Sequence, residues 1–407
     1  MSIPQYVLDS IKPFKDFSDL KLSIVKINPF GNTQFDFSGN NEIIFKLPRT
    51  GLLIGTESKL YASVKVDGDA ASNDAIMSDV HTVFDRHVVE IGNQEVLREE
   101  QFGWFRSLEF DAKSSSSDRN SVSSTIMNIP PAEGTASGLY KKFCIPLASK
   151  WNNRGFFSTP KPLFNTDQFT LRYFINRNLA QYTTATTAAT SLDVKDCFIE
   201  CYILDSPQIR KLYQSTDIVD TFDTIYHYNA KVQSGSTSIS TNIPVTYQNL
   251  RSLMMLQRES ADVIDPNWET GTASLAYYKY THALQLNSIS KFNVDIDGRA
   301  VLDKDMELYP DYTELPTNLA RAWNLDRLGD WHDQSTLDPT DGKGYIAVGF
   351  SPSLEGVSGQ NLQNKSGSIV VRSNFNSALS ANCDFDYFLM YSKYYKIGKD
   401  GSFSITK

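Results

Sequence analysis

The sequence predicts a nearly all-β protein made of two similar sandwich domains. Segments in which apolar and polar residues alternate dominate the chain. Its 407 residues are too many for one sandwich and suit two domains of about 200 residues each. Short sequence patterns also recur in the same order in both halves, which indicates an internal duplication.

The predicted strands are separated by turn clusters rich in Gly, Asn, Asp and Ser. Because alternate side chains of a strand point to opposite faces, each alternating segment can bury one face in a core. The 24 Phe and 20 Tyr residues suit such half-buried surfaces. The clearest predicted strands are residues 42–47, 59–66, 169–174, 224–228 and 368–372.

Helical patterns are sparse, so the predicted class is all-β with a few short helices. The predicted helices are residues 101–111, 207–214 and 319–331. The second begins with Ser206 as its N-cap and Pro207 in its first position, a pairing typical of helix starts.

Three pairs of segments support the duplication. Residues 89–100 resemble residues 294–305, since each reads as a strand, a polar turn and a returning strand. The other pairs are residues 169–172 with 369–372 and residues 197–204 with 383–390. Strands resemble one another by composition alone, but three ordered pairs favour duplication. We therefore predict an N-terminal arm at 1–20, a first sandwich at 21–215 and a second at 216–407.

The charge and the cysteine pattern argue against nucleic-acid binding, a zinc site and disulfide bonds. The net charge is −8 and no Lys/Arg-rich run occurs, so specific nucleic-acid binding is not expected. The four cysteines do not have the spacing of zinc ligands. Cys197 and Cys201 are four residues apart on a predicted strand, which places them too far from each other for a disulfide. We expect all of them to be reduced core thiols, made in a reducing compartment. They are Cys144, Cys197, Cys201 and Cys383.

The N-terminal segment does not resemble a secretory signal, because it lacks a long apolar stretch. No run elsewhere approaches the roughly 18 apolar residues that span a bilayer. The segment does carry an amphipathic stripe, formed by Ile3, Val7, Ile11 and Phe14. This stripe either packs on the first domain or serves as an arm under neighbouring subunits or on an internal membrane.

The sequence contains no recognisable catalytic signature. GxSxG, GxGxxG and GxxxxGK[ST] loops are all missing. The histidines form no tight ligand pair and are expected to be structural or exposed. They are His81, His87, His227, His282 and His332. We therefore predict no enzyme, no catalytic or cofactor-binding residue and no metal site.

Two groups of aspartates are also expected to be structural. Asp67-Gly68-Asp69 could offer oxygen ligands to a hard cation, but a tight turn after the preceding strand is the simpler interpretation. Three more aspartates lie three residues apart near the predicted domain junction, where we expect a solvated face. These are Asp217, Asp220 and Asp223.

Acidic pairs raise the alternative of a glycosidase. Glu99/Glu100 and Asp303/Asp305 would serve glycoside hydrolysis only if two carboxyl groups converged across a cleft. Their matching positions in the two halves are explained more simply by the duplication. Asn364 begins a glycosylation sequon, which we interpret as a chance match in the absence of a secretory signal.

Several stretches carry a resemblance to a known family. They are residues 151–157 with the strand that follows at 169–174, residues 198–214, residues 292–308 with the helix predicted after them, and the C-terminal residues 385–407. Together with the two-fold repeat, they resemble the double jelly-roll major capsid proteins. That lineage includes adenovirus hexon, Polinton-type viruses, virophages and related tailless phages.

The resemblance implies two tandem jelly-roll β-sandwich barrels and a structural function. The expected unit is a pseudo-hexagonal homotrimeric capsomer of an icosahedral double-stranded DNA virus, without a cofactor. The implied partners are neighbouring capsomers, penton and minor capsid proteins and, through the arm, an internal membrane. The implied location is the virion, after synthesis inside the host cell.

Two other functions remain open from the sequence. A carbohydrate-binding or receptor-binding spike protein built from tandem β-sandwiches predicts surface aromatic residues and a Ca²⁺ cluster on one rim. A β-sandwich glycosidase predicts two facing carboxylates.

Overall fold

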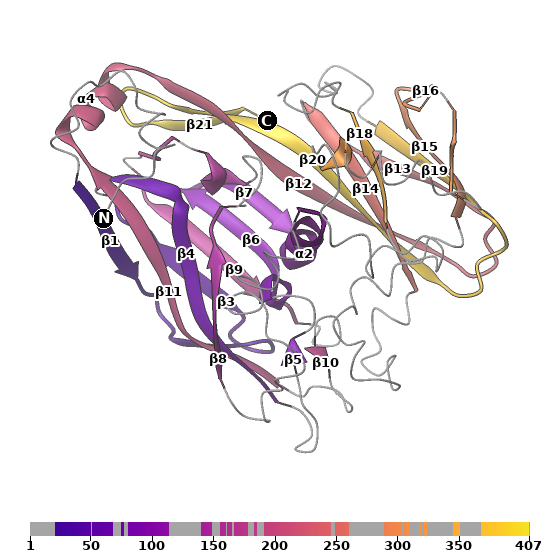
Figure 1. The fold of residues 1–407 in the computed structure, drawn as a ribbon, viewed down its shortest axis with the longest axis horizontal. Coiled ribbons are helices and arrows are strands. Elements are labelled where there is room, and N and C mark those ends of the chain that lie inside the picture. The colour runs from indigo at the N-terminus through magenta and orange to yellow at the C-terminus, as the bar shows by residue number, and fades with distance from the viewer. Residues whose placement is uncertain are drawn as a thin grey trace.

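The computed structural model describes residues 21–49, 51–67, 75–76, 80–113, 140–148, 155–159, 161–164, 167–177, 183–184, 191–245, 249–259, 289–302, 304–308, 318, 321–323, 345–350 and 368–406. They form two β-sandwiches that lie side by side, one from each half of the chain (Figure 1). Every ladder between the strands of both sandwiches is antiparallel. The all-β class is therefore confirmed.

The first sandwich contains sheets I and II. Sheet I has the order β1-β11-β4-β8, with β2 also paired to β11, and sheet II has the order β3-β9-β6-β7. The strands of sheet I are β1 (Lys21–Ile27), β2 (Gln34–Asp36), β4 (Leu52–Asp67), β8 (Lys141–Pro146) and β11 (Ser191–Asp205). Those of sheet II are β3 (Glu42–Lys46), β6 (Phe84–Ile91), β7 (Gln94–Glu100) and β9 (Phe169–Ile175). A separate ribbon pairs β5 (Ala75–Ile76) with β10 (Thr183–Thr184).

The second sandwich contains sheets III and IV. Sheet III has the order β12-β20-β14-β18, with β21 paired to β20, and sheet IV has the order β13-β19-β15-β16, with β17 paired to β15. The strands of sheet III are β12 (Ile218–Val232), β14 (Leu250–Glu259), β18 (Ile346–Gly349), β20 (Cys383–Ile397) and β21 (Phe403–Thr406). Those of sheet IV are β13 (Ser238–Pro244), β15 (Ile289–Ile296), β16 (Arg299–Ala300), β17 (Met306–Glu307) and β19 (Ser368–Phe375).

The two sandwiches have the same topology. Without the short strands β2, β5, β10, β17 and β21, the main strands of each half follow the order first-eighth-third-sixth in one sheet and second-seventh-fourth-fifth in the other. Two such four-stranded sheets packed face to face form a jelly roll. The three pairs of similar sequence segments fall on equivalent strands, namely β6–β7 with β15–β16, β9 with β19, and β11 with β20.

Two of the predicted helices are confirmed. The first is α2 (Phe102–Lys113), which follows β7. The second is α4 (Pro207–Ser215), which connects the last strand of the first sandwich to the first strand of the second (Figure 1). The backbone N–H of Ile209 donates to the Ser206 hydroxyl at 3.3 Å, so Ser206 is the N-cap. Two 3₁₀ turns are η1 (Val80–Val83) and η4 (Phe156–Ser158).

The third predicted helix, 319–331, lies mostly outside the described residues. Within it, Arg321 and Ala322 are helical and Trp323 follows in a turn. Trp323 is fully buried.

The strand β20 differs from an ordinary sandwich strand because both of its faces are buried. Phe385 points toward sheet IV, where its ring centroid lies 6.0 Å from that of Phe375. Phe388 points the other way, and its ring centroid lies 5.2 Å from that of Phe105 on α2. Both Phe385 and Phe388 are 0% exposed. One face of β20 thus lines the core of its own sandwich, and the other packs against the first sandwich.

Replacing either Phe385 or Phe388 by alanine should lower the free energy of unfolding by about 3–5 kcal/mol, because each truncation leaves a cavity in a packed environment. Denaturant titration of each full-length variant measures the change. Val219→Ala is the control, since Val219 is 54% exposed and its truncation should change stability by less than about 0.5 kcal/mol. A Phe388→Ala variant as stable as the Val219→Ala control would contradict the packing assigned to β20.

Candidate functional site

The contact between the two sandwiches is formed by α2 against the outer face of sheet III, the face turned away from sheet IV (Figure 1). The Phe105 ring of α2 lies 5.2 Å from that of Phe388 and 5.4 Å from that of Trp323, between ring centroids. All three side chains are buried. Trp323 also donates its indole N–H to the Tyr345 hydroxyl at 2.6 Å. These rings come from both halves of the chain, so the sandwiches share one aromatic core at their contact.

A buried ion pair lies beside these rings. Arg258 of β14 donates its Nε to Asp386 of β20 at 3.0 Å and also contacts that carboxylate through Nη2. The same carboxylate lies 2.8 Å from His227 Nε2 and accepts from Asn229 Nδ2 at 2.9 Å. On the other side, the Arg258 guanidinium stacks over Trp104 of α2, 3.7 Å from the ring centroid. Sheet III thus supplies the charges, and α2 supplies their aromatic cover.

The electrostatics of Asp386 depend on this set of partners. Burial alone would raise the pKa of Asp386, but the attraction of Arg258 and the hydrogen bonds of His227 and Asn229 hold that pKa well below its usual range. The carboxylate is therefore ionised at neutral pH. Removing water from two charges is costly, and such a pair is stable only while its partners stay in place. The cluster therefore favours one position of α2 on sheet III.

Further ionisable groups are buried on α2 and beside it. Arg106 Nη1 donates to Glu109 Oε2 at 2.9 Å, and both side chains are buried. His87 Nδ1 lies 3.9 Å from Glu99 Oε2. Burial lowers the pKa of His87, although the nearby Glu99 acts in the opposite direction, so the imidazole is neutral at neutral pH. Glu99 is buried while the Glu100 side chain is 44% exposed, so this predicted acidic pair does not converge across a cleft.

A second contact between the sandwiches forms around η4. Phe156 packs against three rings of the second sandwich, with centroid distances between 5.5 and 5.9 Å. These rings belong to Phe222, Tyr395 and Phe403. The Gly155 N–H donates to the Asp223 carbonyl at 2.7 Å. Gly155 has a φ of +81°, and a Cβ there would lie 2.9 Å from Arg106 Nη2, so glycine allows this close approach.

The expectation of a solvated face for three aspartates is wrong for one of them. Asp217 is exposed, and Asp220 is half-buried and accepts from the Thr159 hydroxyl at 2.9 Å. Asp223 is 6% exposed and accepts from Arg251 Nη1 at 2.9 Å. The physical reason is that β12 runs from the surface into the contact between the sandwiches, which the spacing of residues in the sequence does not reveal.

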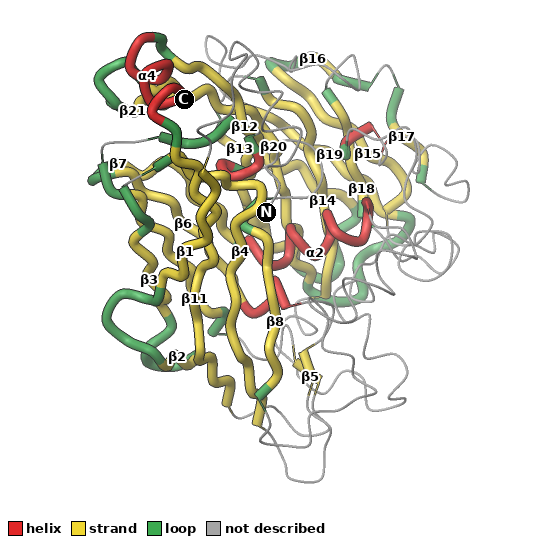
Figure 2. Tube along the Cα trace, turned by 60° about the vertical axis from the view of Figure 1, so that its left-hand side comes forward, coloured by secondary structure: helices red, strands yellow, loops and turns green. Residues whose placement is uncertain are grey.

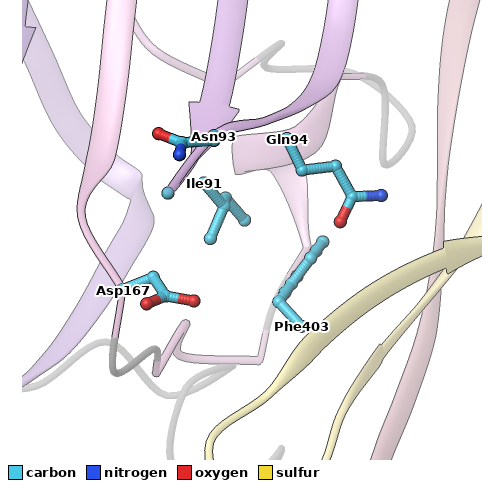
Figure 3. A pocket seen from close by; sticks show the side chains of 6 residues that line it. Ile91, Asn93, Gln94, Asp167 and Phe403 are labelled. Carbon is cyan, nitrogen blue, oxygen red and sulfur yellow. The ribbon is translucent and has the colours of Figure 1, made fainter.

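An open hollow of about 550 Å³ lies where the β6–β7 turn approaches β21 (Figure 3). It is lined by Ile91, Gly92, Asn93, Gln94, Asp167 and Phe403. The polar side chains belong to the first sandwich and Phe403 to the second, so the hollow lies on the seam between the two sandwiches. One carboxylate is among its lining residues, whereas glycoside hydrolysis requires two.

The other predicted residues do not assemble into a site in the part of the chain that the structure describes. There, no group of three or more His, Cys, Asp or Glu side chains is placed to hold a metal ion. All four cysteines are buried and none forms a disulfide, as expected. His81 is buried in η1, and Asp67 ends β4. The predictions for Gly68, Asp69, His282, Asp303, His332, Asn364 and residues 1–20 concern positions outside the described residues.

Among the described residues, no helix has both the length and the apolar character needed to cross a bilayer.

Sequence reasoning missed the contact of α2 with sheet III. The available signal was the apolar run of β20, residues 387–391, which lacks the alternation of a strand with one solvated face. Such a run is typical of a strand buried on both faces. A partner for the outer face of sheet III therefore follows from the sequence, but the identity of that partner does not.

The ion pair makes stability depend on pH. Because the folded-state pKa of Asp386 is lowered, its contribution is fully present above the unfolded-state pKa of about 3.9 and declines as the pH falls below that value. Asp386→Asn should lower the free energy of unfolding by about 3–5 kcal/mol near neutral pH, since Arg258 loses its partner. The difference between wild type and variant should stay constant down to about pH 4 and shrink as the pH falls further toward about pH 2.

Denaturant titrations over this pH range measure the difference. Asp217→Asn is the matched control, because its carboxylate is exposed and its removal should have little effect. A destabilisation by Asp386→Asn that is small or independent of pH would contradict the assigned role of the cluster.

One of three comparisons with known proteins finds matches, and it concerns the fold. Neither a scan against models of protein families nor a search of curated proteins finds a match. Solved structures do match. The PBCV-1 protein VP54, fitted into a reconstruction of the virophage Sputnik, has a TM-score of 0.67 at 11% identity, with 97% of this chain and 98% of that chain covered.

Two major capsid proteins are also similar. That of Faustovirus has a TM-score of 0.57 at 8% identity and covers 94% of this chain and 91% of its own. That of mavirus has a TM-score of 0.50 at 13% identity and covers 100% and 95%. At such identities the likeness concerns the fold. The chain therefore has the double jelly-roll fold, which it shares with these capsid proteins from nearly one end to the other.

Proposed function

We propose that this protein is a major capsid protein, a structural subunit in the shell of an icosahedral double-stranded DNA virus. The observation that carries the proposal is the pair of topologically identical sandwiches joined by a shared buried contact. The structural likeness to capsid proteins over nearly their whole length supports it. A capsid subunit acts through the surfaces that contact other subunits. The buried contact between the two sandwiches holds those surfaces in one rigid body.

We propose further that three copies of the chain form a homotrimer. The contact within one chain is heterologous, because the α2 side of one sandwich meets the outer face of a sheet in the other. Heterologous contacts generate closed rings when the rotation between units closes. Each chain supplies two similar sandwiches, so three chains supply a ring of six. The resulting trimer is a pseudo-hexagonal block with neighbours on six sides.

The proposed division of the chain is an arm at 1–20, a first sandwich at 21–215 and a second at 216–407. In support, the described strands of sheets I and II all precede α4, and those of sheets III and IV all follow it. The proposed partners are two further copies, neighbouring capsomers, and penton and minor capsid proteins, with the arm reaching an internal membrane. The proposed location is the virion, after synthesis in the host cell.

We infer that the protein acts without catalysis. The described carboxylates that suggested chemistry take part in structural contacts instead. Glu99 is buried close to His87, and Asp305 accepts a hydrogen bond from Asn293 Nδ2 at 2.7 Å.

The mass of the purified protein in solution tests the proposal. Multi-angle light scattering should give about 137 kDa, three times the 45.8 kDa of one chain. A single species of one-chain mass at every concentration would contradict the trimer. It would favour the sugar-binding alternative, and a glycan array with an Asn93→Ala variant in the hollow would then test that alternative.

A further inference from the structure

The outer faces of sheets I and III occupy equivalent places in the two sandwiches but have different surroundings. On sheet III, this face is covered by α2, and β20 is buried on both sides. On sheet I, the corresponding residues of β11 remain half-buried, among them Phe198, Glu200 and Tyr202. Figure 2 shows β1, β11, β4 and β8 of sheet I side by side at the front of the view. Among the described residues, sheet I thus lacks the cover that sheet III has.

The aromatic residues of the two faces correspond. The offset of 186 residues between the last pair of repeat segments relates Tyr202 of β11 to Phe388 of β20. Phe388 is the residue that packs on α2 within the chain. On sheet I, Tyr202 is joined by the stacked rings of Tyr61 and Phe198, whose centroids lie 4.9 Å apart. A half-buried group of three aromatic rings on an otherwise uncovered sheet face is typical of a protein–protein contact.

The charged residues of the two faces correspond as well. The same offset relates Glu200 to Asp386. On sheet III, Asp386 is paired with Arg258 of the neighbouring strand β14. On sheet I, Glu200 lies in register between Lys26 of β1 and Lys59 of β4. Each face therefore carries an acidic residue beside basic ones, with an aromatic residue two positions further along the strand.

The second sandwich carries the complementary side. In the first sandwich, the side that meets sheet III includes α2 and the edge strand β7, whose Val96 carbonyl accepts from Lys393 Nζ at 3.2 Å. The strand equivalent to β7 is β16, the edge of sheet IV, and its residues Arg299 and Ala300 are exposed. Folded proteins generally cover or protect the edges of their sheets. In the described part of one subunit, the outer face of sheet I and the β16 edge thus lack the cover that their counterparts, sheet III and β7, have.

We propose that the outer face of sheet I binds the β16 edge of the second sandwich of a neighbouring copy of this chain. This inference rests on the homotrimer proposed above and identifies its interface. We call the binding surface the sheet I patch, which consists of Tyr61, Phe198, Glu200 and Tyr202. The contact repeats between chains the arrangement that α2 and β7 make with sheet III within one chain. Because the patch and the edge lie on different sandwiches, each copy binds two neighbours, and three copies close a ring.

Light scattering of the full-length Tyr202→Glu variant tests the patch. The new carboxylate would lie in a desolvated contact beside Glu200, so the mass should fall threefold, from about 137 kDa to the 45.8 kDa of one chain. Tyr202→Phe retains the ring and should keep the trimeric mass. Val219→Glu, which places the same charge at a position that is 54% exposed on β12, should also leave the mass unchanged.

The masses of the wild type and of the variant test the homotrimer and the sheet I patch separately. A trimeric Tyr202→Glu variant would overturn the patch and leave the homotrimer standing, whereas a wild-type monomer would overturn the homotrimer itself. If circular dichroism shows that Tyr202→Glu does not fold, lysine acylation of the wild-type trimer tests instead whether the sheet I patch is buried between subunits. Protection of Lys26 and Lys59 relative to Lys396, whose side chain is 49% exposed, supports the patch, and equal labelling of all three overturns it.

Discussion

The burial of sheet III on both faces is the constraint on which the rest of the structure depends. A sheet in a sandwich usually buries one face in its own core and leaves the other to water. Here the second face carries Phe388 and a charged cluster, neither of which is stable in the absence of a cover. The α2 helix supplies that cover. The two sandwiches are therefore parts of one rigid subunit and not two domains on a flexible linker.

The same constraint explains how two copies of one topology acquire different tasks. Sheets I and III have equivalent strand orders. The outer face of sheet III is covered within the chain, whereas the outward residues of β11 on sheet I are only half-buried. After the internal contact is made, the outer face of sheet I and the β16 edge, the counterparts of its two sides, thus stay without a partner in the described part of the chain. Association through those surfaces extends the internal contact to further copies without requiring a new kind of interface.

The fold follows from the sequence to a large extent, because sandwich strands alternate and duplication repeats their turns. The strands at 42–47 and 169–174 and the N-cap at Ser206 depend on local patterns, and the structure confirms them. The contact between the sandwiches depends on residues such as Phe105 and Phe388, which are distant in sequence. Local sequence patterns indicate that both faces of β20 are buried, but they do not identify α2 as the element that covers the outer face. For the same reason, the burial of Asp223 was not predicted.

An electron microscopic image of the purified protein, viewed along its symmetry axis, tests most directly whether the sandwiches form a rigid subunit and a closed ring. We expect particles with three-fold symmetry in which six sandwich-sized densities form a ring of nearly hexagonal outline. The two densities of each chain should be joined in the same way as the densities of adjacent chains. Particles in which two sandwiches of one chain take variable relative positions, or in which the chains associate without forming such a ring, would contradict this expectation.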